Sequence, residues 1–577
     1  GKVPGLQVAQ AYGKPGDEGN SMSIRGAGTF SSAGNSPMVL IDGVAGDMAN
    51  LNPADIESIS VLKDASSSAI YGARAANGVI IVTTKKGKSG ALTIDYDVNL
   101  QLQKASRLPK LLSNSADYMT FWNEGRARNG LTPYFSQAEI DSFRYSTNKA
   151  KYPNYNWVDE MFHTAAVQDH HLNVSGGNEK TRFTLGVSYL DQPGVLDAYA
   201  FKKYTAHLSV DSRVKDWITI GGIINMSKRD VKESYINSNN GDYMLSVFGS
   251  GPNYTPTMTL PDGSTGYVAR YSSGIGEWTV RNPLAENSAG SYMQNLYNVS
   301  TQFYVDVQLS KHLHWYTKGA AVLDDYFSKL HESAVDNYYF KDSTFAHNNA
   351  PVHLGVADNY NQTLLTTAYS TLNYHNVFND KHDVDILVGY NQESNFYRQL
   401  GGTRVTFPTS SIKELNAGAA LGQTTSGTAN EWGIRSFFGR ATYNFKGKYL
   451  FEADARYDGT SRISPGNRWG FFPSLSAGWR ISAESFAKKW DWMSNLKLRA
   501  SWGQLGNQNV GLYPYQDLLS TTSYPFNELD PGVQLTRLVD KTLKWETTTM
   551  TDIGVDLDVK NGLFSLTADW YNKVTDN

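Results

Sequence analysis

Cysteine is absent from this sequence of 577 residues, and charged residues are scarce. Without cysteine, the chain has no disulfide framework, no thiolate zinc site and no cysteine nucleophile. Charged side chains make up 19% of the residues, below the roughly 25% of ordinary soluble domains. The 52 basic and 55 acidic residues give a formal net charge of −3. This balance excludes a generally basic chain that attracts nucleic acid.

Long apolar runs are also missing. A membrane-spanning helix needs roughly 18 or more consecutive apolar residues, so a helical membrane protein is excluded. A membrane β-barrel is not excluded, because its alternating strands give only a weak hydropathy signal. Aromatic and small residues are plentiful instead, with 13 Trp, 35 Tyr, 24 Phe and 51 Gly. This composition favours an all-β chain, since aromatic side chains fit pleated surfaces.

Residues 1–88 predict a small mixed α/β domain that is rich in Gly, Ser and Ala. Turn and cap residues separate its short apolar segments. Its predicted elements are a strand at 37–41 that ends in the turn Asp42-Gly43, a short helix at 64–72 with Asp64 as its N-cap and Gly72 at its end, and a buried strand at 78–84.

From residue 91 onward, apolar residues recur at every second position, as they do in long strands. We expect about fifteen such strands, most of them long enough for the roughly 9–11 residues of a tilted membrane strand. The predicted domains are therefore residues 1–88 and residues 91–577. The alternation is clearest at 91–103, 449–457, 496–503 and 563–571.

The links between these strands differ in length along the chain. Short links and long links mostly alternate, as expected of a barrel with tight turns on one rim and large loops on the other. The links 193–202 and 483–495 fit this rule least well. The short links are 177–180, 213–216, 311–312, 446–447 and 560–562, and the long ones are 104–166, 230–296, 328–361, 395–430 and 507–541.

Alternation alone does not decide between a membrane barrel and a soluble antiparallel sheet with one solvated face. The unequal links favour the barrel, and so do aromatic residues at predicted strand ends, which are typical of a membrane girdle. These aromatic residues are Trp217, Trp315, Tyr374, Tyr449, Trp479 and Trp545.

Motifs for catalysis or cofactor binding are not found. Gly87-Lys88-Ser89 ends like a phosphate-binding loop, but Val82 stands where that motif requires glycine. The histidines at 170–171 and at 312–314 have no carboxylate at metal-ligand spacing, so we expect them on the wall of the sheet. Asp458 to Arg462 predict a turn. We expect neither an enzyme nor a bound cofactor or metal.

Several sequence blocks resemble, in order and spacing, the SusC/RagA-like branch of the TonB-dependent outer-membrane transporters. The first three blocks are Ser23 to Gly26, Val39 to Val44 and Ile56 to Ala65. The others are Ala69 to Ile80, Thr83 to Lys85, Tyr457 to Arg462, Leu498 to Gly503 with Gly506 to Gln508, Leu543 to Glu546 and Asp569 to Lys573.

The resemblance implies a mostly β fold, in which a small α/β plug is followed by an antiparallel transmembrane β-barrel in the bacterial outer membrane. About 22 strands are usual in such barrels, and we expect fifteen. The family's signal peptide, its small regulatory-like domain and its TonB-contacting segment are not found before Gly1. We therefore expect a chain that lacks the first part of the plug and the last barrel strands.

In function, the resemblance implies import of an oligosaccharide, or sometimes a peptide. The TonB–ExbB–ExbD complex would supply the energy, and a SusD-like surface lipoprotein would act as the lid. The alternative is a surface protein that does not transport, such as an adhesin or a glycan-binding module.

The resemblance also implies candidate site residues. Arginines of the plug are expected to pair with barrel glutamates in a releasable lock. Glu452 is the candidate glutamate, because the alternation of its strand places it on the inner face. The alternative is that each arginine finds its hydrogen-bond partners within the plug. Aromatic side chains of the long links are candidates for ligand or lid contacts, although each of them could instead pack the loops together. The first set is Arg25, Asp42, Lys63, Asp64, Tyr71, Arg74 and Glu452, and the second is Trp122, Trp157, Tyr243, Tyr254 and Trp278.

Overall fold

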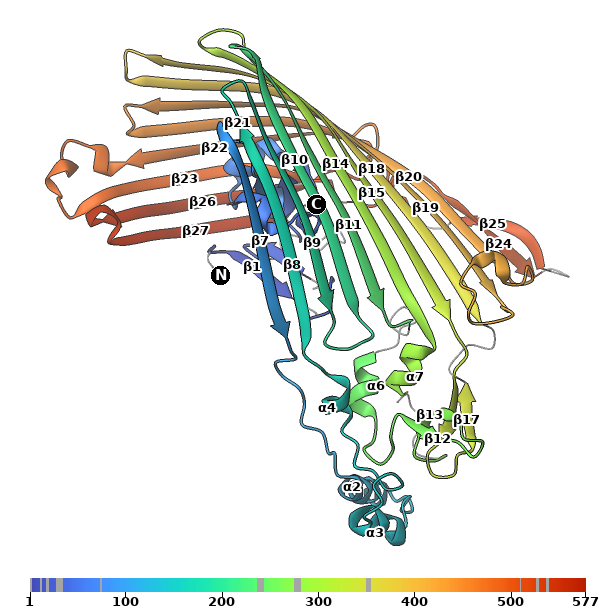
Figure 1. The fold of residues 1–577 in the computed structure, drawn as a ribbon. Coiled ribbons are helices and arrows are strands. Elements are labelled where there is room, and N and C mark those ends of the chain that lie inside the picture. The colour runs from blue at the N-terminus through green and yellow to red at the C-terminus, as the bar shows by residue number, and fades with distance from the viewer. Residues whose placement is uncertain are drawn as a thin grey trace.

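A sheet of fifteen antiparallel strands dominates the computed structural model of this chain (Figure 1). Each strand of this sheet pairs with the next one along the chain, and β7 and β27 lie at its two ends. The expected number of strands is confirmed. The structure describes residues 3–10, 13–16, 20–26, 35–72, 75–235, 243–273, 282–348, 354–508, 510–525, 529–535 and 539–576.

The strands of the large sheet run from residue 90 to residue 576, and the elements inserted between them belong to the loops. In chain order they are β7 (Gly90–Gln103), β8 (Ala165–Gly177), β9 (Thr181–Pro193), β10 (Ala200–Lys215), β11 (Ile218–Glu233), β14 (Gly290–Gln308), β15 (Leu313–Glu332), β18 (Gly355–Phe378), β19 (His382–Val405), β20 (Thr424–Phe445), β21 (Tyr449–Thr460), β22 (Trp469–Arg480), β23 (Met493–Asn507), β26 (Glu546–Val559) and β27 (Phe564–Asp576).

The predicted period of two gives this sheet an apolar outer face and a polar inner face. In β21, Phe451 and Tyr457 are 52% and 45% exposed, whereas Asp454, Arg456 and Asp458 are buried. A soluble sheet buries its apolar face, so the order is inverted here, as in membrane barrels. The inner face is the one that the N-terminal domain covers.

The links between strands separate onto two rims, as the sequence predicts. The short-turn rim carries the links at 178–180, 216–217, 309–312, 379–381, 446–448, 481–492 and 560–563. The long-loop rim carries the links at 104–164, 194–199, 234–289, 333–354, 406–423, 461–468 and 508–545. The two links that fit the length rule least well, 194–199 and 481–492, still fall on alternate rims.

Two local predictions are wrong. Trp545 does not belong to an aromatic girdle, because it is 7% exposed and its Nε1 donates a hydrogen bond to the carbonyl of Arg468. The turn predicted over Asp458 to Arg462 begins only at Ser461, so its start is wrong: Asp458 to Thr460 complete β21, and the Asp458 carboxylate accepts a hydrogen bond from Arg456. The other five strand-end aromatics, Trp217, Trp315, Tyr374, Tyr449 and Trp479, all lie at the short-turn rim.

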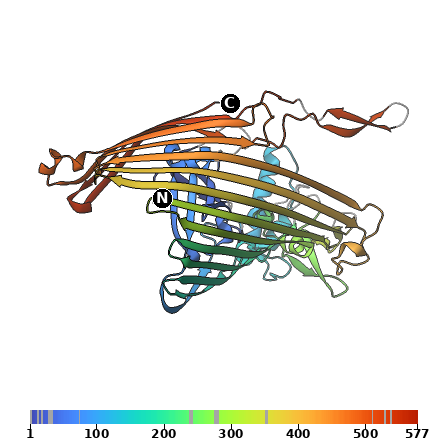
Figure 2. The same ribbon diagram turned by 90° about the horizontal axis from the view of Figure 1, so that it is seen from above.

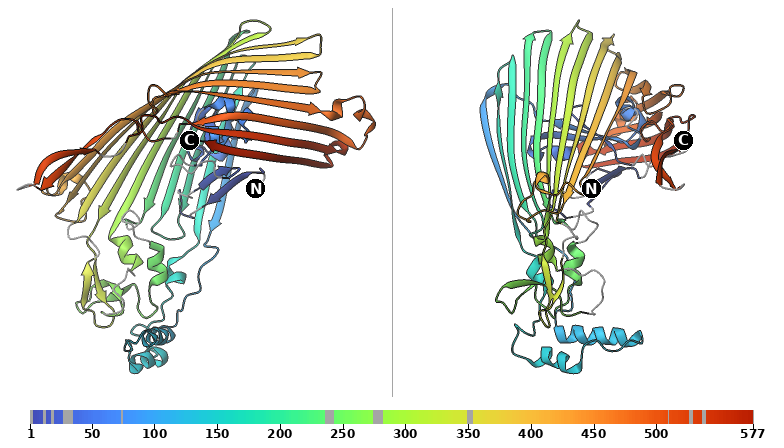
Figure 3. Two further views of the ribbon diagram at one scale, coloured as in Figure 1. Left: turned by 180° about the vertical axis from the view of Figure 1, so that it is seen from behind. Right: turned by 90° about the vertical axis from the view of Figure 1, so that its right-hand side faces the viewer.

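The N-terminal domain, which we call the plug, lies against the inner face of the large sheet (Figures 1 and 3). Its main sheet has the order β4-β3-β6-β5, with β3 and β6 parallel, and a separate hairpin β1–β2 precedes it. The predicted turn at Asp42-Gly43 joins β3 to β4. A division of the chain between residues 88 and 91 remains our proposal.

The elements of the plug are short, and its core is formed by Ile24, Ile41, Leu51, Ile80 and Val82. Its strands are β1 (Leu6–Gln10), β2 (Asn20–Ile24), β3 (Met38–Ile41), β4 (Val44–Ala45), β5 (Ile56–Leu62) and β6 (Val79–Thr84). Its helices are η1 (Met48–Asn50), η2 (Pro53–Asp55), α1 (Ala65–Ser68), η3 (Ala69–Tyr71) and η4 (Ala75–Asn77).

Three long links form one packed unit, which we call the loop cap; it consists of the described parts of 104–164, 234–289 and 333–354. Its aromatic core joins the first two links. The predicted capping box at Ser136 and Glu139 is confirmed. The elements of the cap are α2 (Ser115–Arg128), α3 (Gln137–Tyr145), α4 (Trp157–Met161), α6 (Tyr243–Gly249), α7 (Pro283–Ser288), β12 (Thr257–Thr259), β13 (Thr265–Arg270), β16 (Asp336–Tyr339) and β17 (Phe345–Asn348).

A second hairpin, formed by β24 (Leu519–Pro525) and β25 (Leu529–Leu535), projects away from the sheet at the long-loop rim (Figure 2). Among the described helices, none has both the length and the apolar character needed to span a membrane. The remaining short helices are η5 (Leu415–Ala417), η6 (Ile481–Ala483), η7 (Ala487–Lys489) and η8 (Lys560–Gly562).

Candidate functional site: the contact between plug and wall

The plug touches two parts of the large sheet. We call strands β7 to β15 the early wall and strands β20 to β27 the late wall. Five of the seven candidate plug and lock residues lie at these contacts, and the two walls hold the plug by different chemistry.

Arg25 connects the plug to the late wall. It follows β2 directly and adopts a left-handed backbone conformation (φ 57°), an uncommon conformation for a residue with a side chain. Its Nη1 lies 2.8 Å from Asp64 Oδ1, and its Nη2 lies 2.8 Å from Asp552 Oδ2 of β26. The arginine side chain is 7% exposed and Asp552 is 4% exposed. Arg25 therefore forms a buried ion pair across the plug–wall boundary.

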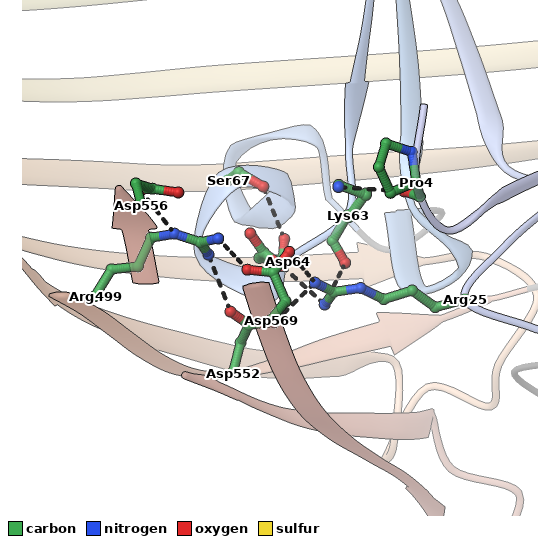
Figure 4. A network of polar contacts seen from close by, with 9 residues as sticks. All are labelled: Pro4, Arg25, Lys63, Asp64, Ser67, Arg499, Asp552, Asp556 and Asp569. Carbon is green, nitrogen blue, oxygen red and sulfur yellow. Dashed lines mark hydrogen bonds and ion pairs between the residues drawn. The ribbon is translucent and has the colours of Figure 1, made fainter. Parts of the chain in front are cut away.

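A larger network surrounds this pair (Figure 4). Asp552 Oδ1 lies 3.2 Å from Arg499 Nη1 of β23, so the plug arginine and a wall arginine share this carboxylate, and Arg25 Nη2 also lies 3.9 Å from Asp569. Arg499 also pairs with Asp556 at 3.3 Å and with Asp569 of β27. Figure 4 shows the two guanidinium groups approaching the central carboxylates from opposite sides. The network holds two cations and four carboxylates.

Asp64 and Lys63 support Arg25 from within the plug. Asp64 stands at the predicted N-cap of α1, but its side chain makes no capping hydrogen bond and pairs with Arg25 instead. The Lys63 carbonyl lies 3.5 Å from Arg25 Nη1, and Lys63 Nζ donates a hydrogen bond to the Pro4 carbonyl at 3.3 Å. The guanidinium carbon of Arg25 lies 4.4 Å from the ring centroid of Tyr571, in cation–π range. The start of α1 is thereby tied to the late wall.

The expected pairing of a plug arginine with Glu452 is wrong. Glu452 lies on the inner face of β21 as predicted, but its carboxylate is 3.6 Å from Arg440 of β20. Arg440 also pairs with Asp454 at 2.7 Å and donates a hydrogen bond to the Ser66 carbonyl at 3.3 Å. Glu452 thus orients a wall arginine that holds the backbone of α1, while an aspartate on β26 takes the plug arginine.

A third arginine of the late wall, Arg456, holds the end of the same segment. Its Nη1 donates a hydrogen bond to the Ile70 carbonyl at 2.6 Å, and its Nε donates to Asp458 at 2.7 Å. Its guanidinium packs so closely against Gly72 that a Cβ added to this glycine would overlap Arg456 Nη2. We call residues 64–72 the clamped segment, because arginine contacts hold it at both ends.

Tyr71 completes the clamped segment. It packs beside Leu40 and Val79 of the plug core. Burial raises the pKa of the Tyr71 hydroxyl above its ordinary value near 10, and the nearby Arg440 guanidinium offsets part of this rise. The phenol is therefore held in its neutral form next to the late wall.

The early wall holds the plug mainly through backbone carbonyls. Lys318 of β15 donates hydrogen bonds to the carbonyls of Asp42 and Gly43 at 3.0 and 3.1 Å. The Asp42 carboxylate accepts hydrogen bonds from Thr84 N and Oγ1, which joins the ends of β3 and β6. Further wall donors contact plug carbonyls: Gln302 reaches Ile41, Lys203 reaches Ala49 and Leu51, and a His207 ring nitrogen lies 2.8 Å from the Lys85 oxygen.

Side-chain pairs add to this contact. His171 of β8 lies 2.8 Å from the Asp55 carboxylate, and both groups are buried. Ser227 of β11 donates a hydrogen bond to Asn50 Oδ1 at 3.1 Å. The early wall also approaches closely, since a Cβ added at Gly186 of β9 would overlap Asp55 Oδ1. The predicted position of His171 on the wall is confirmed.

The aromatic residues of the long links, the candidates for ligand or lid contacts, also need correction. Trp157, Tyr243 and Tyr254 are 2%, 1% and 4% exposed, so their rings pack the loop cap and do not face a ligand. Trp157 Nε1 donates a hydrogen bond to the Gly251 carbonyl, and its ring meets Tyr254 edge-on. Trp122 is partly buried against the same core. Arg74 and Trp278 lie outside the described residues.

Electrostatic contacts strengthen the cap at its surface. Lys341 pairs with Glu139, so the link 333–354 is joined to the link 104–164. Burial raises the pKa of the Glu139 carboxyl, but hydrogen bonds from Lys341 and Ser136 outweigh this effect and hold the pKa below its ordinary value. Among the described residues, no group of three or more His, Asp or Glu side chains could hold a metal ion.

Sequence reasoning missed Asp552, Arg499, Arg440, Arg456 and Lys318. A signal for Asp552 exists, because Asp552, Asp556 and Asp558 occupy one face of β26 while Ile553, Val555 and Leu557 occupy the other. Charged residues that alternate with apolar ones must face a polar interior. The partner of each one depends on the order of strands around the sheet.

Two family models match the chain. The model described as TonB-dependent Receptor Plug Domain matches residues 1–79, and the model described as TonB dependent receptor-like, beta-barrel matches residues 227–577. The chain belongs to the TonB-dependent receptors. This TonB-dependent receptor is of the SusC/RagA-like type, and it is a β-barrel protein of the bacterial outer membrane.

Similar proteins agree with this assignment. The TonB-dependent receptor SusC of Bacteroides thetaiotaomicron is 31% identical over 615 residues, which cover 100% of this chain and 57% of SusC. The TonB-dependent receptor P39 of Formosa agariphila is 30% identical, over 100% of this chain and 52% of that protein. The chain spans between 52% and 57% of the length of the curated relatives it matches.

Solved structures show the same fold. The RagAB peptide importer in its 'closed-closed' state superposes with a TM-score of 0.84 at 22% identity, over 100% of this chain and 65% of that one. The siderophore receptor PirA from Acinetobacter baumannii superposes with a TM-score of 0.53 at 14% identity, over 99% of this chain and 66% of that one.

Proposed function

We propose that this receptor imports a large polar nutrient across the bacterial outer membrane. We propose an oligosaccharide as the nutrient, with a peptide as the alternative substrate that the uptake experiment below distinguishes. The TonB–ExbB–ExbD complex supplies the energy, and a SusD-like surface lipoprotein is the lid. The protein acts as a transporter and not as an enzyme.

The observation that carries this proposal is the Arg25–Asp552 pair. A wall so wide leaves a lumen that must be plugged, and transport then requires a plug that can move. A buried ion pair holds well while both partners are present, and removal of one partner destabilises by about 3–5 kcal/mol because the other charge is left unpaired. Such a contact suits a plug that stays closed at rest and is released when its N-terminal side is pulled. The releasable lock is thus proposed between Arg25 and Asp552.

The loop cap supports the proposed lid. Two links from different parts of the chain share one aromatic core and Phe340 of the third link packs against it, so the cap is a preformed surface above the long-loop rim. Phe121 and Tyr145 on this surface are 61% and 74% exposed. Exposed aromatic side chains are enriched at protein interfaces and offer flat faces to sugar rings.

Uptake of labelled nutrients by intact cells tests the proposal. Fluorescein-labelled starch and xylan oligosaccharides and a labelled tryptic peptide mixture are supplied to cells with and without this protein. We expect one class to enter only when the protein is present, and we expect a protonophore or loss of TonB to abolish entry. Labelled material that binds the surface and never enters would instead support the glycan-binding or adhesin alternative.

A further inference from the structure

A cavity lies between the start of the clamped segment and the late wall. Its volume is about 430 Å³. It lies beside Asp64 and Ser66 of the plug and is lined on the wall side by Asp383 of β19 and by residues of β20 to β26 that include Glu452, Ser476, Arg499 and Asp552. The cavity therefore adjoins the network that holds Arg25.

The lining of this cavity suits a hydrated polar solute. It combines carboxylates, the cationic groups of Lys497 and Arg499 and the serine hydroxyls at 476 and 501 with apolar positions at 450, 451 and 477. Sugar hydroxyl groups both donate and accept hydrogen bonds, so they match a mixed lining of this kind. An apolar solute would lose the hydration of these groups without replacing it.

The early wall has close packing where the late wall has this cavity. At Gly186 an added Cβ would overlap the plug carboxylate of Asp55, as one added at Gly72 would overlap Arg456 on the late wall, so the walls differ in the cavity and in the plug elements that they hold. Wall donors there hold β3 and its turn, which are paired within a four-stranded sheet. The clamped segment contains only a four-residue α-helix and a three-residue 3-10 helix. A short segment with few internal hydrogen bonds opens at a lower free energy than a sheet.

The N-terminal hairpin connects to this weak point. In the β1–β2 pair, Leu6 lies opposite Ile24, so the open end of the hairpin adjoins Arg25. The Arg25 N–H also donates a hydrogen bond to the Gly5 carbonyl at 2.8 Å. Displacement of the chain before β1 is therefore transmitted to Arg25 first.

From these four features we infer that solute passes the plug along the late wall, through the cavity beside the clamped segment, while the early-wall contacts stay in place. This inference rests on the proposed import function. The cavity is the first part of the route. Separation of Arg25 from Asp552 loosens the start of residues 64–72 beside it, and the contacts of Arg440 with Ser66 and of Arg456 with Ile70 are the next to yield as the cavity widens.

Potassium chloride conductance across a planar bilayer tests the route without any nutrient or energy source. The receptor is purified from its own outer membrane, and Arg25→Ala is expected to raise the frequency of conducting events at least tenfold over the unaltered protein. Because the chain has no cysteine, two cysteine pairs can be added to the Arg25→Ala protein and joined by a short bis-maleimide. Ser66→Cys with Ser476→Cys bridges the cavity, and Asn50→Cys with Ser227→Cys bridges the early wall.

Cross-linking across the cavity is expected to return the conductance to the unaltered level. Cross-linking at the early wall is expected to leave it raised, each pair being compared with its own uncross-linked form. A leak that persists under the first cross-link, a leak closed by the second, or no leak in Arg25→Ala would each overturn the inference. If this pattern holds and energised uptake fails, the proposed import function is rejected and the route stands.

Discussion

The early wall and the late wall hold one small plug in two ways. At the early wall, neutral and cationic side chains contact plug carbonyls by hydrogen bonds, and these carbonyls belong mostly to β3, its turn and the ends of β6 and η1. At the late wall, arginines and aspartates form a branched network beside a cavity of about 430 Å³. Close packing and backbone hydrogen bonds make a fixed contact. A buried ion pair beside a cavity is stable at rest and can still separate. The early wall is therefore the fixed contact, and the late wall is the contact that moves.

The largest expected effect follows from removing a wall carboxylate. Asp552→Ala removes the wall carboxylate nearest to Arg25 and leaves Asp569, 3.9 Å from Arg25, as the remaining partner that both arginines share. The loss should weaken attachment of the plug by about 3 kcal/mol, the lower end of the range for breaking a buried pair. The measurement is the temperature at which the plug becomes sensitive to protease in the otherwise folded protein. The matched early-wall change is Asp169→Ala, whose contact with Asn52 Nδ2 is 3.4 Å long and should cost under about 1 kcal/mol. Equal shifts of this temperature in the two variants would contradict the proposed difference between the walls.

A smaller effect is expected from filling the space under Arg456. Gly72 has φ 87° and ψ −162°, a backbone region that essentially only glycine adopts, so alanine costs about 1–3 kcal/mol in strain there, against roughly 1 kcal/mol for a positive φ such as the 83° of Gly26. At Gly72 the added Cβ also meets the Arg456 guanidinium, which Asp458 and Ile70 hold in place, and overpacking adds about 1–3 kcal/mol. Gly26 has no atom within 4 Å of the added Cβ.

Denaturant titration of the two alanine variants, followed by the same protease assay, measures this difference. We expect Gly72→Ala to be the more destabilised by about 1–3 kcal/mol. Similar losses in both variants would mean that Arg456 moves aside freely and does not clamp the segment.

On the early wall, Lys318→Met removes two hydrogen bonds to the β3–β4 turn. We expect a loss of about 1–3 kcal/mol because the Asp42 and Gly43 carbonyls lose a buried donor. Protease should then cut near residues 42–43 while the clamped segment stays protected. Cleavage that begins within residues 64–72 would show that the two walls are not independent.

The smallest effect is a pH dependence that belongs to the late wall. Since burial raises the pKa of Tyr71 above about 10, the attached segment keeps its phenol neutral at a pH where the released segment would ionise. Attachment should therefore be unchanged below pH 10 and weaken as the pH rises above it. The same protease assay in wild type and Tyr71→Phe isolates this contribution, and identical profiles would contradict it.

Much of the architecture follows from the order of residues along the chain. The period of two specifies which side chains of each strand share a face, so the inner position of Glu452 and the number of strands are predictable. The turn at Asp42-Gly43 and the capping box at Ser136 are local, and both predictions are confirmed. Link length further separates the two rims.

The pairings across the plug–wall boundary are not local. Glu452 and Asp552 are both acidic residues on inner faces, and only the order and stagger of the strands decide which of them meets Arg25. The rings of Trp157 and Tyr254 come from links with no regular period, so their burial depends on how two loops pack together. The N-cap position of Asp64 was predictable, but its use as a partner for Arg25 was not.

The central claim is that the late-wall contact opens alone. Amide hydrogen exchange in the intact protein, compared between wild type and Arg25→Ala, tests it most directly. The account predicts at least tenfold faster exchange at residues 67–71 and unchanged exchange at residues 79–84 of β6. Faster exchange in both segments, or in neither, would contradict it.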